Sequence, residues 1–332
     1  MAVIHRCLVL LLGLGISLAN AQKLHHSCAE LKGKNSEGVE TNYGDVRGSI
    51  AVAIQEVGAI AETARDYMSK AAENSGDDFD IKRTVNSFYA FQGEKDGAEM
   101  SSQGRWNLAL RNLETIKDYV DNRNTRDPPF LCGDGHLTKF THYENGERIQ
   151  AQDHDGNAFD TYMYFDGFSG EWWAIAEPAC EDDPGTIAIT HPGGYIQVCP
   201  SAFSFAQMTA PRDTIDSDKS EDSKIDWSDK EYEGDYRQSL DYWATPLSYS
   251  MFHELTHFLL GYDDYKISEP VSWIGGTVDK AYKFNGATQL VKEDIDKVPN
   301  NVDNLGMMAL SLFMKSCNWS SGRARGKESK DE

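Results

Sequence analysis

Two histidines four residues apart carry the strongest chemical signal in this 332-residue sequence. They belong to the pattern His-Glu-X-X-His, formed by His253, Glu254 and His257. On a helix, a spacing of four residues places two side chains on one face, where both imidazoles can bind the same Zn²⁺ ion. Glu254 lies beside the pair and is suited to act as a general base toward a water molecule. We therefore predict that both histidines bind zinc and that Glu254 is catalytic.

The residues around this motif predict that it lies on a helix. Thr245 and Pro246 are typical of an N-cap followed by a first-turn proline, and Gly261 is typical of the position after a helix C-terminus. Apolar residues recur between these ends at steps of three and four, namely Leu247, Met251, Leu255 and Phe258. This periodicity predicts one face that packs on a core.

A hydrolytic zinc site usually has three protein ligands, so one more ligand is needed. No histidine follows His257, and neither Glu269 nor Glu293 lies in the helical motif that a glutamate ligand on a second helix requires. An aspartate is the better candidate. Two aspartates follow the motif, Asp264 in "GYDDY" and Asp279 in "GTVDKAY".

The order His-Glu-X-X-His and then Gly-Thr-X-Asp-X-X-Tyr resembles the aspzincin metallopeptidases, the family of deuterolysin and the fungal peptidyl-Lys metalloendopeptidases. The resemblance implies a zincin-like fold, one zinc ion, Asp279 as the third ligand and Tyr282 as a support for the transition state. Asp264 is the alternative ligand, although it has neither the threonine before it nor a tyrosine three residues after it. A packed aromatic behind the ligand is the alternative role of Tyr282. Further segments resemble the family in the same order: the alanine-rich helix that begins near residue 46, "FLC" at 130–132, "YIQVCP" at 195–200 and "NNVDNLGMMALSLF" at 300–313.

The chain differs from the family pattern around the third ligand. Asp279 follows His257 by 22 residues, which makes residues 261–274 an insertion, and Lys283 replaces the last glycine of the motif. This replacement loosens the local turn but removes no chemical group.

The family resemblance also bears on substrate preference. In lysine-selective relatives, acidic residues in the segment that resembles "NNVDNLG" help to form the S1′ pocket. This chain retains Asp303 there, but Gly306 stands in place of a second acid. A carboxylate in a partly dry pocket favours a Lys or Arg side chain. Asp303 therefore either supports a preference for Lys at P1′ or caps a helix that starts near Asn304.

Patterns elsewhere predict an α+β fold that is mainly helical, with a small sheet and the His-Glu-X-X-His helix at its active site. Apolar residues at steps of three and four mark a helix from about 46 to 72 and another whose apolar face runs from Trp106 to Val120. The runs 186–190 and 195–199 flank turn residues typical of a hairpin. We expect one catalytic domain at 46–317, an N-terminal extension at 22–45, an acidic insert near 212–236 and a disordered charged tail at 318–332.

The N-terminal residues predict secretion. Arg6 precedes the apolar run from Leu8 to Leu18 and the small-residue pattern Ala19-Asn20-Ala21, which is typical of a signal peptide at 1–21. An oxidising compartment favours pairing of the later cysteines. We expect Cys28 to pair with Cys132 and Cys180 with Cys199, which leaves Cys317, and Asn318-Trp319-Ser320 is a glycosylation sequon.

A formal net charge of −21 disfavours nucleic acid and anionic membranes as partners. The metal motif and the resemblance to aspzincins, together with the signal peptide, lead us to expect a secreted, monomeric zinc endopeptidase that acts on protein or peptide substrates. The first alternative is a secreted zinc-binding protein of the same fold without turnover, for metal capture or host contact. The second is a binding protein in which Trp172 and Trp173 contact carbohydrate or protein, although paired tryptophans are more often part of a core.

Overall fold

The computed structural model describes residues 24–35, 38–73, 79–91, 98–121, 130–152, 157–160, 162–170, 172–175, 178, 180, 185–191, 194–203, 228–261, 279–314 and 317–325. The signal peptide expected at 1–21 lies outside this part of the chain, as do Asp264 and most of the acidic insert. The chain divides into two compact units, one formed by Met1–Gly48 with Pro128–Pro211 and the other by Ser49–Asp127 with Arg212–Glu332.

This division differs from the single domain at 46–317 that we expected. The segment 22–45 is not a separate extension, because its described residues belong to the first unit. The backbone N–H of His25 donates to the carbonyl of Phe130, and a disulfide bond joins Cys28 to Cys132. The disulfide confirms the predicted pairing of Cys28 with Cys132. The backbone pairing of His25 with Phe130 was not predicted, because contacts between segments so distant in the sequence leave no local pattern.

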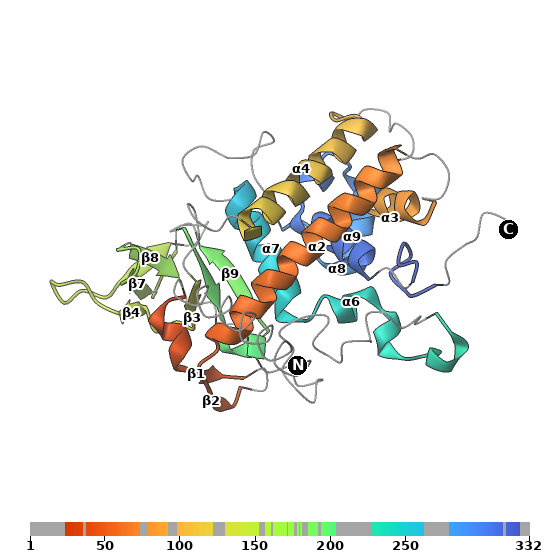
Figure 1. The fold of residues 1–332 in the computed structure, drawn as a ribbon. Coiled ribbons are helices and arrows are strands. Elements are labelled where there is room, and N and C mark those ends of the chain that lie inside the picture. The colour runs from red at the N-terminus through yellow and green to blue at the C-terminus, as the bar shows by residue number, and fades with distance from the viewer. Residues whose placement is uncertain are drawn as a thin grey trace, which may run out of the picture. The chain divides into compact units, whose positions relative to one another are not determined.

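The described residues of the first unit form four small sheets (Figure 1). One is a three-stranded sheet in which β10 (Tyr195–Val198) pairs in parallel with β3 (Phe130–Cys132) and antiparallel with β9 (Ala188–His191). The remaining sheets are antiparallel: β4 (Leu137–Phe140), β7 (Tyr162–Asp166) and β8 (Trp172–Ile175) form one, β1 (Leu31–Lys34) pairs with β2 (Glu40–Gly44), and β5 (Gln150–Gln152) pairs with β6 (Ala158–Asp160). Short 3-10 helices, η2 (His26–Ala29) and η3 (Pro200–Phe203), complete it.

The β9–β10 hairpin confirms the strands predicted at 186–190 and 195–199. All four residues of β10 are buried, as expected for the central strand of its sheet. The N–H of Gly194 donates to the carbonyl of His191. Gly194 has φ +84, a left-handed conformation that glycine adopts without steric cost. The disulfide between Cys180 and Cys199 confirms the second predicted pairing.

The second unit is helical (Figure 1). Its α-helices are α2 (Arg47–Glu73), α3 (Phe79–Tyr89), α4 (Ser102–Asp121), α6 (Leu240–Trp243), α7 (Leu247–Leu260), α8 (Lys283–Glu293) and α9 (Val302–Phe313), and its 3-10 helices are η5 (Lys230–Tyr232), η6 (Tyr236–Gln238) and η7 (Val298–Asn300). In the described part of the chain, no helix combines the length and apolarity needed to cross a membrane. The small sheets of the first unit and the helices of the second together confirm the predicted α+β class.

The long predicted helices are confirmed as α2 and α4, which lie side by side. The predicted face of α2 is buried along its length, at Ile50, Ile54, Val57, Ala61, Ala64 and Met68. A Cβ built on Gly58 of α2 would lie 2.7 Å from Cγ1 of Val120 on α4, so the absence of a side chain lets the two helices approach closely.

Helix α9 is the most deeply placed element of this unit. Every residue from Val302 to Leu312 is buried, and the helix packs against α3, α7 and α8. Its sequence is apolar nearly all round, as a helix inside a core requires. The polar residues of its first turn are therefore buried too, and each needs hydrogen-bond partners.

Residues 318–325 are packed, so the prediction of a disordered tail from 318 is wrong for these residues. The Trp319 ring is fully buried and its Nε1 donates to the carbonyl of Met314, and the backbone of Asn318 pairs with that of Arg325. The Asn318 side chain is 2% exposed and its Nδ2 donates to Asp80 Oδ1. The sequon therefore does not present its acceptor nitrogen, because burial of the tryptophan ring draws this charged stretch onto the helices.

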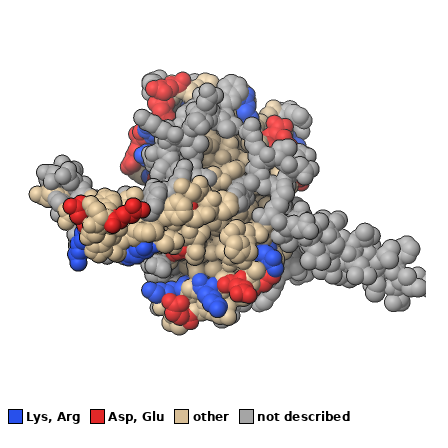
Figure 2. Space-filling view, turned by 90° about the vertical axis from the view of Figure 1, so that its left-hand side faces the viewer, with Lys and Arg blue, Asp and Glu red and all other residues tan. Residues whose placement is uncertain are grey.

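Acidic and basic side chains of the described residues are interspersed on the face drawn in Figure 2.

Two further predictions concern the side chains of one cysteine and of two tryptophans. Cys317 is buried and lies outside both disulfides, as expected. The side chains of Trp172 and Trp173 lie outside the described part of the structure, although their backbone forms strand β8.

Candidate metal centre

Helix α7 carries His253 and His257 and buries Leu247, Met251 and Leu255 of the apolar face predicted for it, whereas Phe258 is half-buried. Pro246 is the N-cap, one residue later than we expected, because the Thr245 hydroxyl donates to the carbonyl of Tyr242 instead of capping the helix. Gly261 follows the last turn with φ +85, a conformation that L side chains rarely adopt. These residues mark the two ends of α7.

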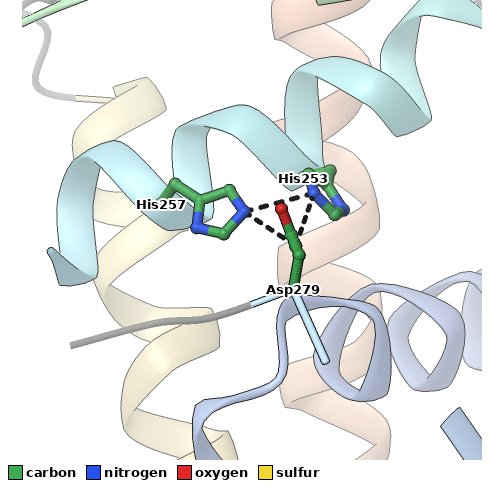
Figure 3. A group of neighbouring side chains, drawn as sticks. All are labelled: His253, His257 and Asp279. Carbon is green, nitrogen blue, oxygen red and sulfur yellow. Dashed lines mark hydrogen bonds and ion pairs between the residues drawn. The ribbon is translucent and has the colours of Figure 1, made fainter. Parts of the chain in front are cut away.

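Three potential ligand atoms converge beside this helix (Figure 3). Nε2 of His257 lies 3.2 Å from Nε2 of His253 and 3.0 Å from Oδ1 of Asp279, and that oxygen lies 3.1 Å from Nε2 of His253. A tetrahedral zinc ion with bonds of about 2.0–2.1 Å places its ligand atoms about 3.3 Å apart. The donor set of two imidazole nitrogens and one carboxylate oxygen therefore fits a zinc ion in both chemistry and spacing.

The third ligand expected from the sequence is thus brought to the histidines. The Asp279 side chain is 20% exposed and that of His257 only 1%, so the centre is most open on the aspartate side. The alternative ligand, Asp264, lies outside the described residues. Among those described, only His253, His257 and Asp279 form a group with metal-ligand spacing.

Asp303 on α9 orients His253. Nδ1 of His253 lies 2.9 Å from Oδ1 of Asp303, whose side chain is almost completely buried. An ionised carboxylate only accepts hydrogen bonds, so Nδ1 must carry the proton. In the neutral imidazole, this leaves the lone pair of Nε2 directed at the metal position. Hydrogen-bonded carboxylates of this kind commonly support histidine ligands in metal proteins.

The structure changes the interpretation of Asp303. Its carboxylate also accepts hydrogen bonds from the Tyr249 hydroxyl and from the backbone N–H of Lys283. It is not a helix cap, because the N-cap of α9 is Asn301. Nor is it open to the side chain of a substrate, because it is buried and already held by three donors. Asp303 therefore does not form a pocket for lysine at P1′.

Gly306 supports the same conclusion. A Cβ built at this position would lie 2.9 Å from the Tyr249 hydroxyl oxygen, closer than real contacts allow. Tyr249 therefore occupies the space that a second acidic side chain would need. Tyr249 precedes His253 by one helical turn and lies on the same side of α7, a signal that sequence reasoning did not use.

Charges in this cluster determine its protonation in the absence of a metal. Burial lowers the pKa of His253, but hydrogen bonds to Asp279 and Asp303, together with the charges of Asp303 and Glu254, outweigh burial and raise the pKa well above its usual value. Burial also raises the pKa of Asp279, but the two histidines outweigh it and hold that pKa far below its usual range. Without a metal, a proton on His253 thus compensates the negative charge of the neighbouring carboxylates. A metal ion that binds to the centre takes over this role, so metal binding should release protons.

Glu254 and Tyr282 both lie next to the histidines. Glu254 is a buried residue of α7, and its charge acts on His253. Tyr282 is 58% exposed, and its ring lies parallel to the His253 imidazole with centroids 6.2 Å apart. Tyr282 is therefore largely exposed and is not a packed aromatic behind the ligand.

Lys283 has a left-handed backbone conformation, which is uncommon for a residue with a side chain. Its φ is +59, in the left-handed region that glycine adopts without steric cost. The Lys283 N–H donates to Asp303 in this conformation.

No protein-family model matches this chain, and no curated protein sequence matches it. The function of the chain must therefore be inferred from its own side chains.

Proposed function

We propose that the chain is a secreted zinc metalloendopeptidase in which His253, His257 and Asp279 bind one zinc ion. The spacing of their three ligand atoms, 3.0–3.2 Å, is the observation that carries the proposal. The carboxylate of Asp303 behind His253 supports it, because a structural pair of histidines has no need of a buried acid that fixes its tautomer. The resemblance of the motif to aspzincins, and with it a zincin-like fold, gives the reaction class.

The bound metal would supply Lewis-acid chemistry, polarising a peptide carbonyl and lowering the pKa of water. In this proposal Glu254 takes a proton from the attacking water and returns it to the leaving amine. In the same proposal Tyr282, which is exposed and has its ring parallel to the His253 imidazole, donates a hydrogen bond to the oxygen that becomes negative in the transition state. A preorganised donor of this kind typically contributes about 3–4 kcal/mol to the barrier reduction.

The two disulfides fit an oxidising, extracellular location, which also agrees with the signal peptide expected at 1–21. We do not extend the proposal to a lysine preference at P1′. Asp303, the residue that would confer it, is occupied by His253, Tyr249 and Lys283.

Hydrolysis of casein and of mixed-sequence peptides by the purified protein tests this function. Cleavage should stop in the presence of a zinc chelator, return on addition of zinc and fall at least 100-fold in Glu254→Gln, which should still bind zinc. Glu293→Gln on α8 is the matched control and should cleave normally. Stoichiometric zinc with no cleavage of any substrate would favour the alternative, a secreted zinc-binding protein. Cleavage that survives both the chelator and Glu254→Gln would contradict the proposal.

A further inference from the structure

The backbone that follows Asp279 has no regular structure before α8 begins at Lys283, yet it must hold the ligand within about half an ångström. One side chain meets this need. Oδ1 of Asn301 accepts hydrogen bonds from the N–H groups of Lys280 and Ala281, at 2.9 and 3.0 Å. Nδ2 of Asn301 donates to the carbonyl of Ala281, at 2.9 Å. Three hydrogen bonds from a single amide thus hold the two residues next to the ligand.

Asn301 is itself held firmly. It is almost completely buried, and its second Nδ2 hydrogen is donated to Oδ1 of Asn304, at 2.8 Å. Asn304 in turn donates to the carbonyls of Phe88 and Ala287, on α3 and α8. The Asn301 amide therefore uses all four of its hydrogen-bonding positions, and only a side chain with two donors and two acceptor positions can do so.

The first turn of α9 also contacts the histidine side of the centre. Asp303, two residues after Asn301, accepts from His253 Nδ1 on α7 and from the Lys283 N–H after the ligand. The first turn of α9 therefore contacts both a histidine ligand and the backbone on either side of Tyr282. A shift of Asp279 relative to α7 would break hydrogen bonds to this turn.

We infer that Asn301 is the positioning residue for the third ligand and sets the zinc affinity of the centre through Asp279. This inference rests on the proposed zinc site. Asn301 touches no ligand atom in the described structure. Its effect on zinc should therefore exist only as long as Asp279 is present to be positioned.

A double-mutant cycle on the full chain separates positioning from general destabilisation. Zinc dissociation constants are measured by competition with a chromophoric chelator for the wild type, Asn301→Ala, Asp279→Ala and the double variant. We expect Asn301→Ala to weaken zinc binding about 10- to 100-fold, as outer-shell substitutions do. In the Asp279→Ala background, the same substitution should change the dissociation constant by less than about twofold. Asn285→Ala, an exposed asparagine of α8, should bind zinc like the wild type.

If Asn301→Ala does not fold, Asn301→Asp replaces it in the cycle. That variant keeps the acceptor toward Lys280 and Ala281 but loses the donor toward the Ala281 carbonyl. Losses of affinity that multiply in the double variant would overturn the positioning role, and so would wild-type affinity in the single variant. A wild-type protein that binds no zinc would instead refute the proposed function itself, so the two failures are distinguishable.

Discussion

Replacing Asp303 with asparagine tests how the centre controls the state of its first ligand. The carboxylate accepts from His253 Nδ1 and the Tyr249 hydroxyl on one oxygen and from the Lys283 N–H on the other. An asparagine has one acceptor oxygen and one donor nitrogen. If the amide oxygen faces His253 and Tyr249, the amide nitrogen, which is a donor, faces the Lys283 N–H. If the oxygen faces Lys283 instead, the nitrogen faces the donors of His253 and Tyr249. The substitution preserves shape and volume, so its effect reports on hydrogen bonding and charge alone.

The expected magnitude follows from that mismatch. A buried donor left without an acceptor costs about 1–3 kcal/mol, and a tenfold change in affinity corresponds to about 1.4 kcal/mol. Zinc should therefore bind about 10- to 100-fold more weakly to Asp303→Asn, in line with other outer-shell substitutions. If the amide nitrogen turns toward His253, it also favours the tautomer with the proton on Nε2, which cannot bind a metal.

Competition with a chelator measures the affinity, and nitrogen NMR of the labelled imidazoles reports which nitrogen of His253 carries the proton. Asp241→Asn is the matched control. Its carboxylate accepts from the Phe284 N–H, and its charge acts on the same cluster: burial first, then Asp303 and then the Asp241 charge raise the pKa of Tyr249. Asp241 makes no described contact with His253. Zinc affinity within threefold of the wild type in Asp303→Asn, or a proton on Nε2 of His253 in the wild-type zinc complex, would refute the reasoning.

Three further predictions follow from the described contacts. Asp279→Ala should weaken zinc binding at least 100-fold while Asp264→Ala leaves it unchanged, and the reverse ranking in the same chelator competition would assign the third ligand to Asp264. Burial lowers the pKa of His191 to about 4, so the unfolded chain, with a histidine pKa of about 6.5, binds more protons between these values. Stability should therefore fall by about 3 kcal/mol as the pH drops from about 6.5 to 4, and urea unfolding at pH 7 and 4.5 should show a smaller fall in His191→Gln; an equal fall would contradict this cause. Lys283→Gly should raise stability by about 0.5–1 kcal/mol, because it relieves a left-handed backbone strain of about 1–2 kcal/mol at some cost in unfolded-state entropy. Lys283→Val should lower stability, and thermal unfolding of both variants measures the difference; equal melting temperatures would show that the turn carries no strain.

Local patterns predicted the parts of the protein that depend on neighbours in sequence. The stacking of His253 and His257 follows from helical geometry, and the buried face of α2 follows from its periodicity. Asp279 was found through a short motif, and the structure places it within 3.1 Å of both histidines. The two predicted disulfide pairings were also correct, although one of them joins cysteines 104 residues apart, which no local pattern encodes.

The remaining features depend on contacts that no local pattern encodes. Asp303 resembled part of a substrate pocket, and only the packing of α9 against α7 shows that its carboxylate is directed to His253. Asn301 carried no signal, because its partners Lys280 and Ala281 are about twenty residues away. The predicted tail was misjudged at Trp319, since charge counts along a segment do not register one aromatic ring that finds a buried site.

The most direct test of the metal centre is an anomalous difference map at the zinc absorption edge, from crystals of the protein grown with one equivalent of zinc. We expect a single peak at about 2.0–2.1 Å from Nε2 of His253, Nε2 of His257 and Oδ1 of Asp279, with Asp303 still hydrogen-bonded to Nδ1 of His253. A peak bound to only one of these histidines, or one completed by another residue such as Asp264 while Asp279 turns away, would contradict it.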